Sequence, residues 1–248
     1  MVFQKTLQLY FQNFKLSIIF GILLVFVLFF LGFSNTFASS GSIFLDYSFL
    51  KESPLLLLLE LLGFIAFTAL YAVFLTLVVF SVRKELSSVR LNFYLREMIQ
   101  KFSVKLFVFL LFFSLLLATI STLLVSAGVS PSIIVSVLFL VSIAFLFTPQ
   151  SIVVDEKGIP QSVYYNFNFI AKKFPHFLLV LFTSAVMLAI IPFIELFLDG
   201  VTGNLGRFFT LALVLIFYVP FIEVLKTQLY MRKFGMIEGA LDFEARMK

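Results

Sequence analysis

Six apolar runs, each 18 to 27 residues long, dominate this chain of 248 residues. A bilayer core about 30 Å thick is crossed by a helix of about 20 apolar residues. Charged residues make up only 12% of the chain and apolar residues 62%, against about 25% and about 45–50% in a soluble domain. We therefore predict a polytopic membrane protein. The runs cover residues 16–33, 54–80, 103–127, 131–148, 175–198 and 206–229.

Proline positions help to place the ends of these runs. Pro54, Pro131 and Pro175 stand at the first positions of the second, fourth and fifth runs, where the missing N–H removes no helical hydrogen bond. Pro149 is expected to close the fourth run. The pattern predicts an all-α fold, a polytopic bundle of six transmembrane helices that forms a single membrane domain over residues 1–248.

Basic residues are distributed unevenly between the two sides of this predicted topology. Of the 18 Lys and Arg, all but Lys51 and Arg207 fall on the side of the two termini. The positive-inside rule then predicts a cell membrane protein with both termini in the cytoplasm. A cleaved signal peptide over residues 1–38 is the competing interpretation. We expect the first span to be retained, because its 18-residue apolar run exceeds the usual length of about 7–15 residues for a signal peptide.

The segments before the odd-numbered runs share a helical pattern. Apolar residues stand four, seven and eleven positions before each of Phe14, Phe102 and Phe174. These residues are Tyr10, Leu7 and Phe3; Met98, Leu95 and Leu91; and Ile170, Phe167 and Val163. The faces opposite to them are polar, and the third carries Gln161, Ser162, Tyr165, Asn166, Lys172 and Lys173. Each segment is predicted to be an amphipathic cytoplasmic helix at the interface, with its polar face toward the headgroups.

This pattern predicts three parallel repeats of an amphipathic helix plus a membrane hairpin. The candidate repeats are residues 1–80, 88–148 and 160–229, followed by a cytoplasmic tail at 230–248. The alternative is that these segments are not repeats. An amphipathic segment is common wherever a chain enters a bilayer beside a basic loop.

The missing residue types exclude several chemistries. Without Cys there is no disulfide, thiolate metal site or cysteine nucleophile, and the single His176 supplies no multi-histidine site. The sequence also contains no nucleophile elbow, zinc-protease or Walker motif. We therefore expect no enzyme activity, no catalytic residue, no cofactor, no bound metal and no nucleic-acid partner.

Ionisable residues and prolines inside the apolar runs are candidate sites, because charge within a membrane span often marks a pathway. Glu223 and Lys226 are spaced to form an ion pair near the cytoplasmic end of the sixth run. Interior prolines free a backbone carbonyl and kink a helix. The candidates for a cavity or a gate are Glu60, Pro192, Glu195, Pro220 and Glu223.

Three stretches resemble a known family. They are Thr148–Val163, Asn168–Phe174 and the closing Leu229–Gly239. They resemble a family of prokaryotic six-span membrane proteins, mostly of unknown function, that is related to the membrane domain of glycerophosphodiester phosphodiesterases. The resemblance implies the order apolar helix, short β-like stretch, acidic turn with glycine, and amphipathic helix. The catalytic barrel is not part of this sequence, so the resemblance implies an architecture and no phosphodiesterase activity.

Two functions follow as hypotheses. The first is a non-catalytic accessory or scaffold protein that engages anionic phospholipids of the bilayer, or a partner, through its basic amphipathic helices. The candidate contacts are Arg90, Arg96, Lys101, Lys172 and Lys173. The alternative is a transporter or lipid-handling protein with a cavity between the three hairpins. A protein partner and a second copy of the chain both stay open.

Overall fold

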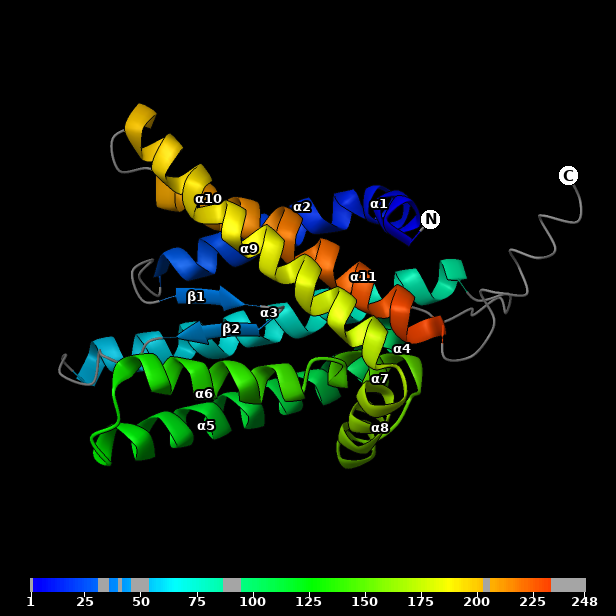
Figure 1. Ribbon diagram of the computed structural model, residues 1–248, viewed down its shortest axis with the longest axis horizontal. Coiled ribbons are helices and arrows are strands. Elements are labelled where there is room, and N and C mark those ends of the chain that lie inside the picture. The colour runs from blue at the N-terminus through cyan, green and yellow to red at the C-terminus, as the bar shows by residue number, and fades with distance from the viewer. Residues whose placement is uncertain are drawn as a thin grey trace, which may run out of the picture.

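The computed structural model describes residues 2–30, 36–39, 42–45, 54–86, 95–202 and 206–232. Over these ranges the chain is a bundle of α-helices with one short β-hairpin (Figure 1). Five helical stretches of the described residues are long and apolar enough to cross a membrane, and three of them combine neighbouring elements. These stretches are Leu61–Leu86, Ile99–Ser126, Pro131–Val154, Phe174–Val201 and Phe209–Met231. A sixth span is obtained if α1 and α2, which meet at an angle of 68°, count as one broken span. The predicted all-α membrane bundle is thus confirmed.

The elements follow one another in three groups. The first group holds α1 (Val2–Gln12), α2 (Phe14–Phe30), β1 (Thr36–Ser39), β2 (Ser42–Leu45) and α3 (Pro54–Leu86). The second holds α4 (Leu95–Met98), the π-helix η3 (Ile99–Ser103), α5 (Val104–Ser126), α6 (Pro131–Ala144) and α7 (Thr148–Val154). The third holds α8 (Ile159–Lys172), α9 (Phe174–Thr202), α10 (Gly206–Leu213), the π-helix η4 (Val214–Tyr218) and α11 (Val219–Met231).

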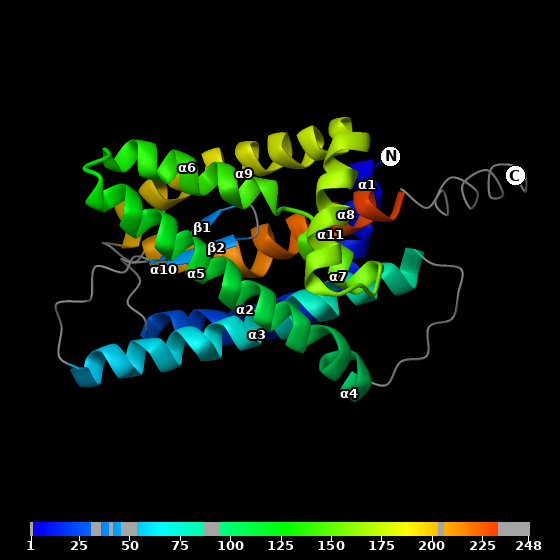
Figure 2. The same ribbon diagram turned by 90° about the horizontal axis from the view of Figure 1, so that it is seen from below.

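The β-hairpin lies in the segment that joins α2 to α3, and the apolar pattern did not predict it. Its strands are antiparallel, with Thr36 opposite Leu45 and Ser39 opposite Ser42. Both perpendicular views place it among the helix hairpins (Figures 1 and 2).

The predicted helix starts at Pro54 and Pro131 are confirmed, but the predicted end of the fourth span is wrong. Helix α6 ends at Ala144, and residues 145–147 form a turn before α7. Pro149 therefore opens α7 rather than closing α6. The β-like stretch that the family resemblance implies after Thr148 is helical, because these residues are all buried and satisfy their backbone within a short helix.

Asn166 of α8 satisfies the backbone at this break. Its amide group donates to the Ala144 carbonyl at 2.7 Å, and its carbonyl oxygen accepts from the Phe147 N–H at 2.8 Å. A break in an apolar surrounding leaves backbone groups that need such partners. Asn166 and Ser162 are fully buried, so their predicted place on a face toward the headgroups is wrong. Their polar side chains face the protein instead.

Each amphipathic segment packs on the second membrane-spanning stretch of another group, and in the second group the contacted part of that stretch is α7. Helix α1 packs on α11, η3 packs on α3, and α8 packs on α7, while α3, α7 and α11 also contact one another. The second amphipathic segment differs from the prediction, since α4 and η3 run directly into α5. Its residues Met98 and Phe102 are buried in the protein core rather than exposed to lipid. Leu91 lies outside the described residues.

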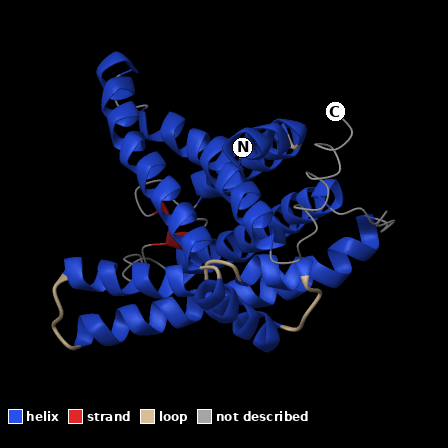
Figure 3. Ribbon diagram, turned by 45° about the vertical axis from the view of Figure 1, so that its right-hand side comes forward, coloured by secondary structure: helices blue, strands red, loops and turns tan. Residues whose placement is uncertain are grey.

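Tight packing is concentrated at one end of the bundle. We call it the basal end: α1, α7 and α8 lie there, and α3 and α11 finish there. Among the described residues of α5, the buried apolar ones all lie between Leu106 and Leu117. Those of α9 are Phe177 and Val180, near its basal start. The α5–α6 and α9–α10 hairpins project away from this end (Figures 1 and 3).

Substitution of Asn166 tests the account of the α6–α7 break. We expect Asn166→Ala to lower the free energy of unfolding by about 2 kcal/mol, because two buried backbone groups lose their partners. Thermal unfolding in detergent measures this change. The exposed Gln161 of the same helix provides the control: Gln161→Ala should shift the unfolding temperature little, and equal shifts for both variants would contradict the account.

Candidate functional site

Helix α11 is the centre of the basal end. Each of its residues from Val219 to Met231 is buried. Five of these residues are polar, and they are Glu223, Lys226, Thr227, Gln228 and Tyr230. Because buried polar groups need hydrogen-bond partners, these side chains must bond within the protein. Glu223, Gln228 and Tyr230 bond to three other parts of the chain, while Lys226 and Thr227 bond to Glu223 of the same helix.

Of the ion pairs between described residues, the one that Glu223 forms is the most deeply buried. Lys226 Nζ donates to one carboxylate oxygen at 2.7 Å, which confirms the predicted pairing, and Gln150 Nε2 of α7 donates to the other at 2.7 Å. The side chains of Glu223 and Lys226 are only 1% and 3% exposed. Both carboxylate oxygens are thus engaged. The Oε1 atom of Gln150 is buried without a described partner.

Helix α1 bonds to α11 and to η4. Thr6 Oγ1 donates to Gln228 Oε1 at 2.6 Å. Pro220 has no N–H, so the Ile216 carbonyl four residues earlier lacks its usual helical donor. The Tyr10 hydroxyl donates to that carbonyl at 3.1 Å. The backbone group freed by Pro220 is therefore satisfied by the N-terminal amphipathic helix.

The turn from α7 to α8 is held by charged contacts. Arg83 of α3 donates to the Val153 carbonyl and to Glu156 Oε1, each at 2.9 Å, and Lys101 forms an ion pair with the other Glu156 oxygen. Glu156 has a φ of 57°, a left-handed conformation uncommon for a residue with a side chain. Burial would raise the pKa of Glu156, but hydrogen bonds and charges from Lys101 and Arg83 outweigh it and hold the pKa below its ordinary value.

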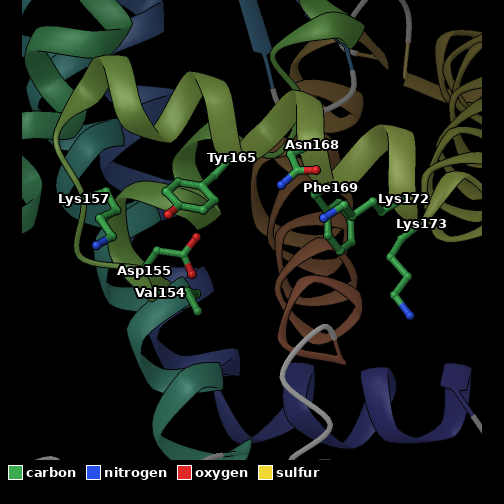
Figure 4. A pocket seen from close by; sticks show the side chains of 8 residues that line it. All are labelled: Val154, Asp155, Lys157, Tyr165, Asn168, Phe169, Lys172 and Lys173. Atoms are coloured by element: carbon green, nitrogen blue, oxygen red, sulfur yellow. The ribbon is translucent and has the colours of Figure 1, made fainter.

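Beside this turn lies an open groove of about 550 Å³, formed by the end of α7, the turn and α8. Its lining residues are Val154, Asp155, Lys157, Tyr165, Asn168, Phe169, Lys172 and Lys173 (Figure 4). Tyr165 extends from α8 toward Asp155 and Phe169 lies beside Lys172, while Lys157 stands at the opposite end of the groove from Lys172 and Lys173. Three lysines against one carboxylate make the lining basic.

Asp155 is oriented by two hydroxyl groups. Tyr230 of α11 donates to Asp155 Oδ2 at 2.6 Å, and Ser151 Oγ lies 3.2 Å from the same oxygen. The position of the groove therefore depends on the buried end of α11. Within the part of the chain that the structure describes, none of Lys157, Lys172 and Lys173 forms an ion pair, so their ammonium groups are available to an anion.

The predicted contacts for anionic lipid come together only in part. Lys172 and Lys173 line the groove, whereas Lys101 is paired with Glu156. Arg90 and the side chain of Arg96 lie outside what the structure describes. Sequence reasoning missed Lys157, although its place in the acidic turn with glycine was a usable signal.

The predicted cavity or gate residues do not form one site. Glu195 lies in α9, where its backbone carbonyl oxygen is close to Gly206 of α10. Glu223 follows Gly206 by 17 residues, roughly 25 Å along a helix at about 1.5 Å per residue. Pro192 is exposed, within an unbroken α9. The side chain of Glu60 lies outside the described residues.

Metal binding finds no support in the described ranges, which hold no cluster of three or more His, Cys, Asp or Glu residues suited to a metal ion. Comparisons of the chain with protein-family models, with curated proteins and with solved structures found no match. The resemblance to the membrane domain of glycerophosphodiester phosphodiesterases therefore stays a prediction that rests on short motifs.

Substitutions in the buried pair test its structural role. Glu223→Gln leaves the Lys226 charge buried without a counter-charge, and we expect it to lower the free energy of unfolding by about 3–5 kcal/mol. The double variant Glu223→Gln with Lys226→Met removes both charges. Its new amide is able to pair with both groups of the Gln150 amide, so most of the stability should return. Thermal unfolding in detergent compares the three proteins, and a double variant as unstable as the single one would contradict this view.

The Glu156 cluster predicts a pH dependence of stability. Because the folded-state pKa lies below the ordinary value of 4.5, the ionised carboxylate stabilises the fold above that pH. The contribution is lost as the pH falls through the folded-state pKa. We expect about 1 kcal/mol or less from this partly exposed cluster. Unfolding temperatures between about pH 6 and pH 3 should fall less steeply for Glu156→Gln than for the unchanged protein, and parallel curves would contradict the assignment.

Proposed function

We propose that this chain is a non-catalytic membrane protein, an accessory or scaffold, that engages anionic phospholipid or a partner protein through its basic basal end. We place it in a cell membrane with both termini in the cytoplasm. The observation that carries the proposal is the groove beside α8, with its three lysines and a single carboxylate. Each basic residue near an anionic membrane surface contributes about 1 kcal/mol of attraction.

The faces of α8 support an interfacial position. Asn166 and Phe169 are buried against the protein, while the apolar Phe167 and the amphipathic Tyr164 are 47% and 67% exposed. Lys172 is exposed on a further side. A helix with one face on the protein, one apolar face exposed and one basic edge suits the boundary between headgroups and acyl chains.

Helix α1 also has one face on the protein and an exposed apolar face. Thr6 and Tyr10 are buried against the protein, while Phe3 and Phe11 are exposed by 46% and 63%. Two amphipathic helices at the basal end thus present apolar side chains that a bilayer would cover.

The alternative of a transporter or lipid-handling protein gains less support. An ionisable group that faces a cavity between the hairpins would support it. Glu223 is instead packed in the core, with both carboxylate oxygens bonded to Lys226 and Gln150.

Lipid retention tests the proposed function. We expect the protein, extracted from mixed bilayers, to retain phosphatidylglycerol in preference to phosphatidylcholine. The preference should weaken at about 1 M salt, where the Debye length is only about 3 Å. Replacement of Lys5, Lys15, Lys172 and Lys173 by Gln should lower it by at least about 30-fold. Lipid extraction and mass spectrometry give the ratio. No preference in the unchanged protein, or one that neither salt nor neutralisation alters, would contradict the proposal.

A further inference from the structure

We propose that the groove formed by the α7–α8 turn and α8 is a binding site for the phosphate group of an anionic phospholipid headgroup. The inference rests on the proposed function, since it names the lipid group that one part of the basal end recognises. It goes further by assigning recognition to a defined site rather than to dispersed surface charge.

The charge of the lining favours a phosphodiester anion. Lys157, Lys172 and Lys173 outnumber the one carboxylate, that of Asp155. Lysine binds phosphate as a point charge with three donors. One oxygen of Asp155 accepts from Tyr230 and Ser151, and the lining as a whole carries three positive charges against one negative charge.

Uncharged donors complete the lining. The Asn168 side chain extends from α8 between Tyr165 and Lys172 (Figure 4), and its amide group is able to donate to a phosphate oxygen or a headgroup hydroxyl. Phe169 forms an apolar wall of the same groove. The volume of about 550 Å³ falls in the range of about 300–1,000 Å³ that is usual for small-molecule sites, so a headgroup with its phosphate fits.

The surroundings of the groove favour a lipid over a soluble phosphate ester. Tyr164 stands one helical turn before Asn168, on the same side of α8, and it is 67% exposed. Phe167 and Phe174 are also exposed, by 47% and 51%. Phe174 directly follows Lys173 and begins the membrane helix α9. A lipid with its phosphate in the groove therefore finds apolar surface for its acyl chains nearby.

Binding titrations on the full chain in detergent test this site. The probes are short-chain phosphatidylglycerol, short-chain phosphatidylcholine and free glycerol 3-phosphate, with affinity measured by native mass spectrometry. We expect Lys172→Gln with Lys173→Gln to weaken phosphatidylglycerol binding by about 30-fold. Asn168→Ala, which changes no charge, should weaken it by about tenfold through the loss of a donor to a charged group.

The matched control is Lys5→Gln with Lys15→Gln. It removes the same charge from the N-terminal segment, and neither residue lines the groove. We expect it to weaken phosphatidylglycerol binding by less than about threefold, because detergent offers no anionic membrane surface to attract these two lysines, and the bound headgroup lies in the groove. Circular dichroism and the unfolding temperature establish that each variant is folded.

The outcomes separate this inference from the proposed function. If the control pair weakens phosphatidylglycerol binding as much as the groove pair, lipid attraction is diffuse and the groove site is wrong, while the proposed function stands. If phosphatidylglycerol binds no better than phosphatidylcholine to any of these proteins, both fail. If free glycerol 3-phosphate binds as tightly as the lipid, the groove is a site for soluble phosphate esters and the assignment to a lipid headgroup is overturned.

Discussion

A helix that is buried on all sides within a membrane protein must satisfy its polar side chains inside the protein, and α11 is such a helix. Glu223 bonds to α7, Gln228 bonds to α1, and Tyr230 bonds to the α7–α8 turn. These polar contacts hold α1, α7 and α8 around α11. Since Tyr230 orients Asp155 in the groove, the proposed binding site depends on the same buried helix.

The packing of the amphipathic segments has a cyclic pattern. Each packs on the second membrane-spanning stretch of another group: α1 packs on α11, η3 packs on α3, and α8 packs on α7. Thr6 and Asn166 both stand eight residues before the phenylalanines Phe14 and Phe174 that anchor the predicted repeat. Both are fully buried, and both hydrogen-bond to another group. Three copies of one unit would produce this arrangement, and the repeat itself stays a prediction.

The sequence predicted features within one segment well and contacts between distant segments poorly. The helix starts at Pro54 and Pro131 and the pairing of Glu223 with Lys226 follow from spacing within one segment. The burial of Asn166 does not follow from spacing, because an amphipathic pattern separates polar from apolar faces without saying whether a polar face meets water, headgroups or protein. For the same reason Lys172 and Lys173 were predicted as basic contacts, but the groove between them and Lys157 was not.

The sequence by itself determined that this chain crosses a membrane as a helical bundle with basic amphipathic segments, because the length of apolar runs and helical periodicity are local properties. Only the tertiary structure decided which polar residues are buried and where the basic groove lies. Gln150 and Glu223 are 73 positions apart, and Thr6 and Gln228 are 222 apart. Such partners are selected by three-dimensional packing, since a buried polar group bonds to whatever donor or acceptor the fold brings to it.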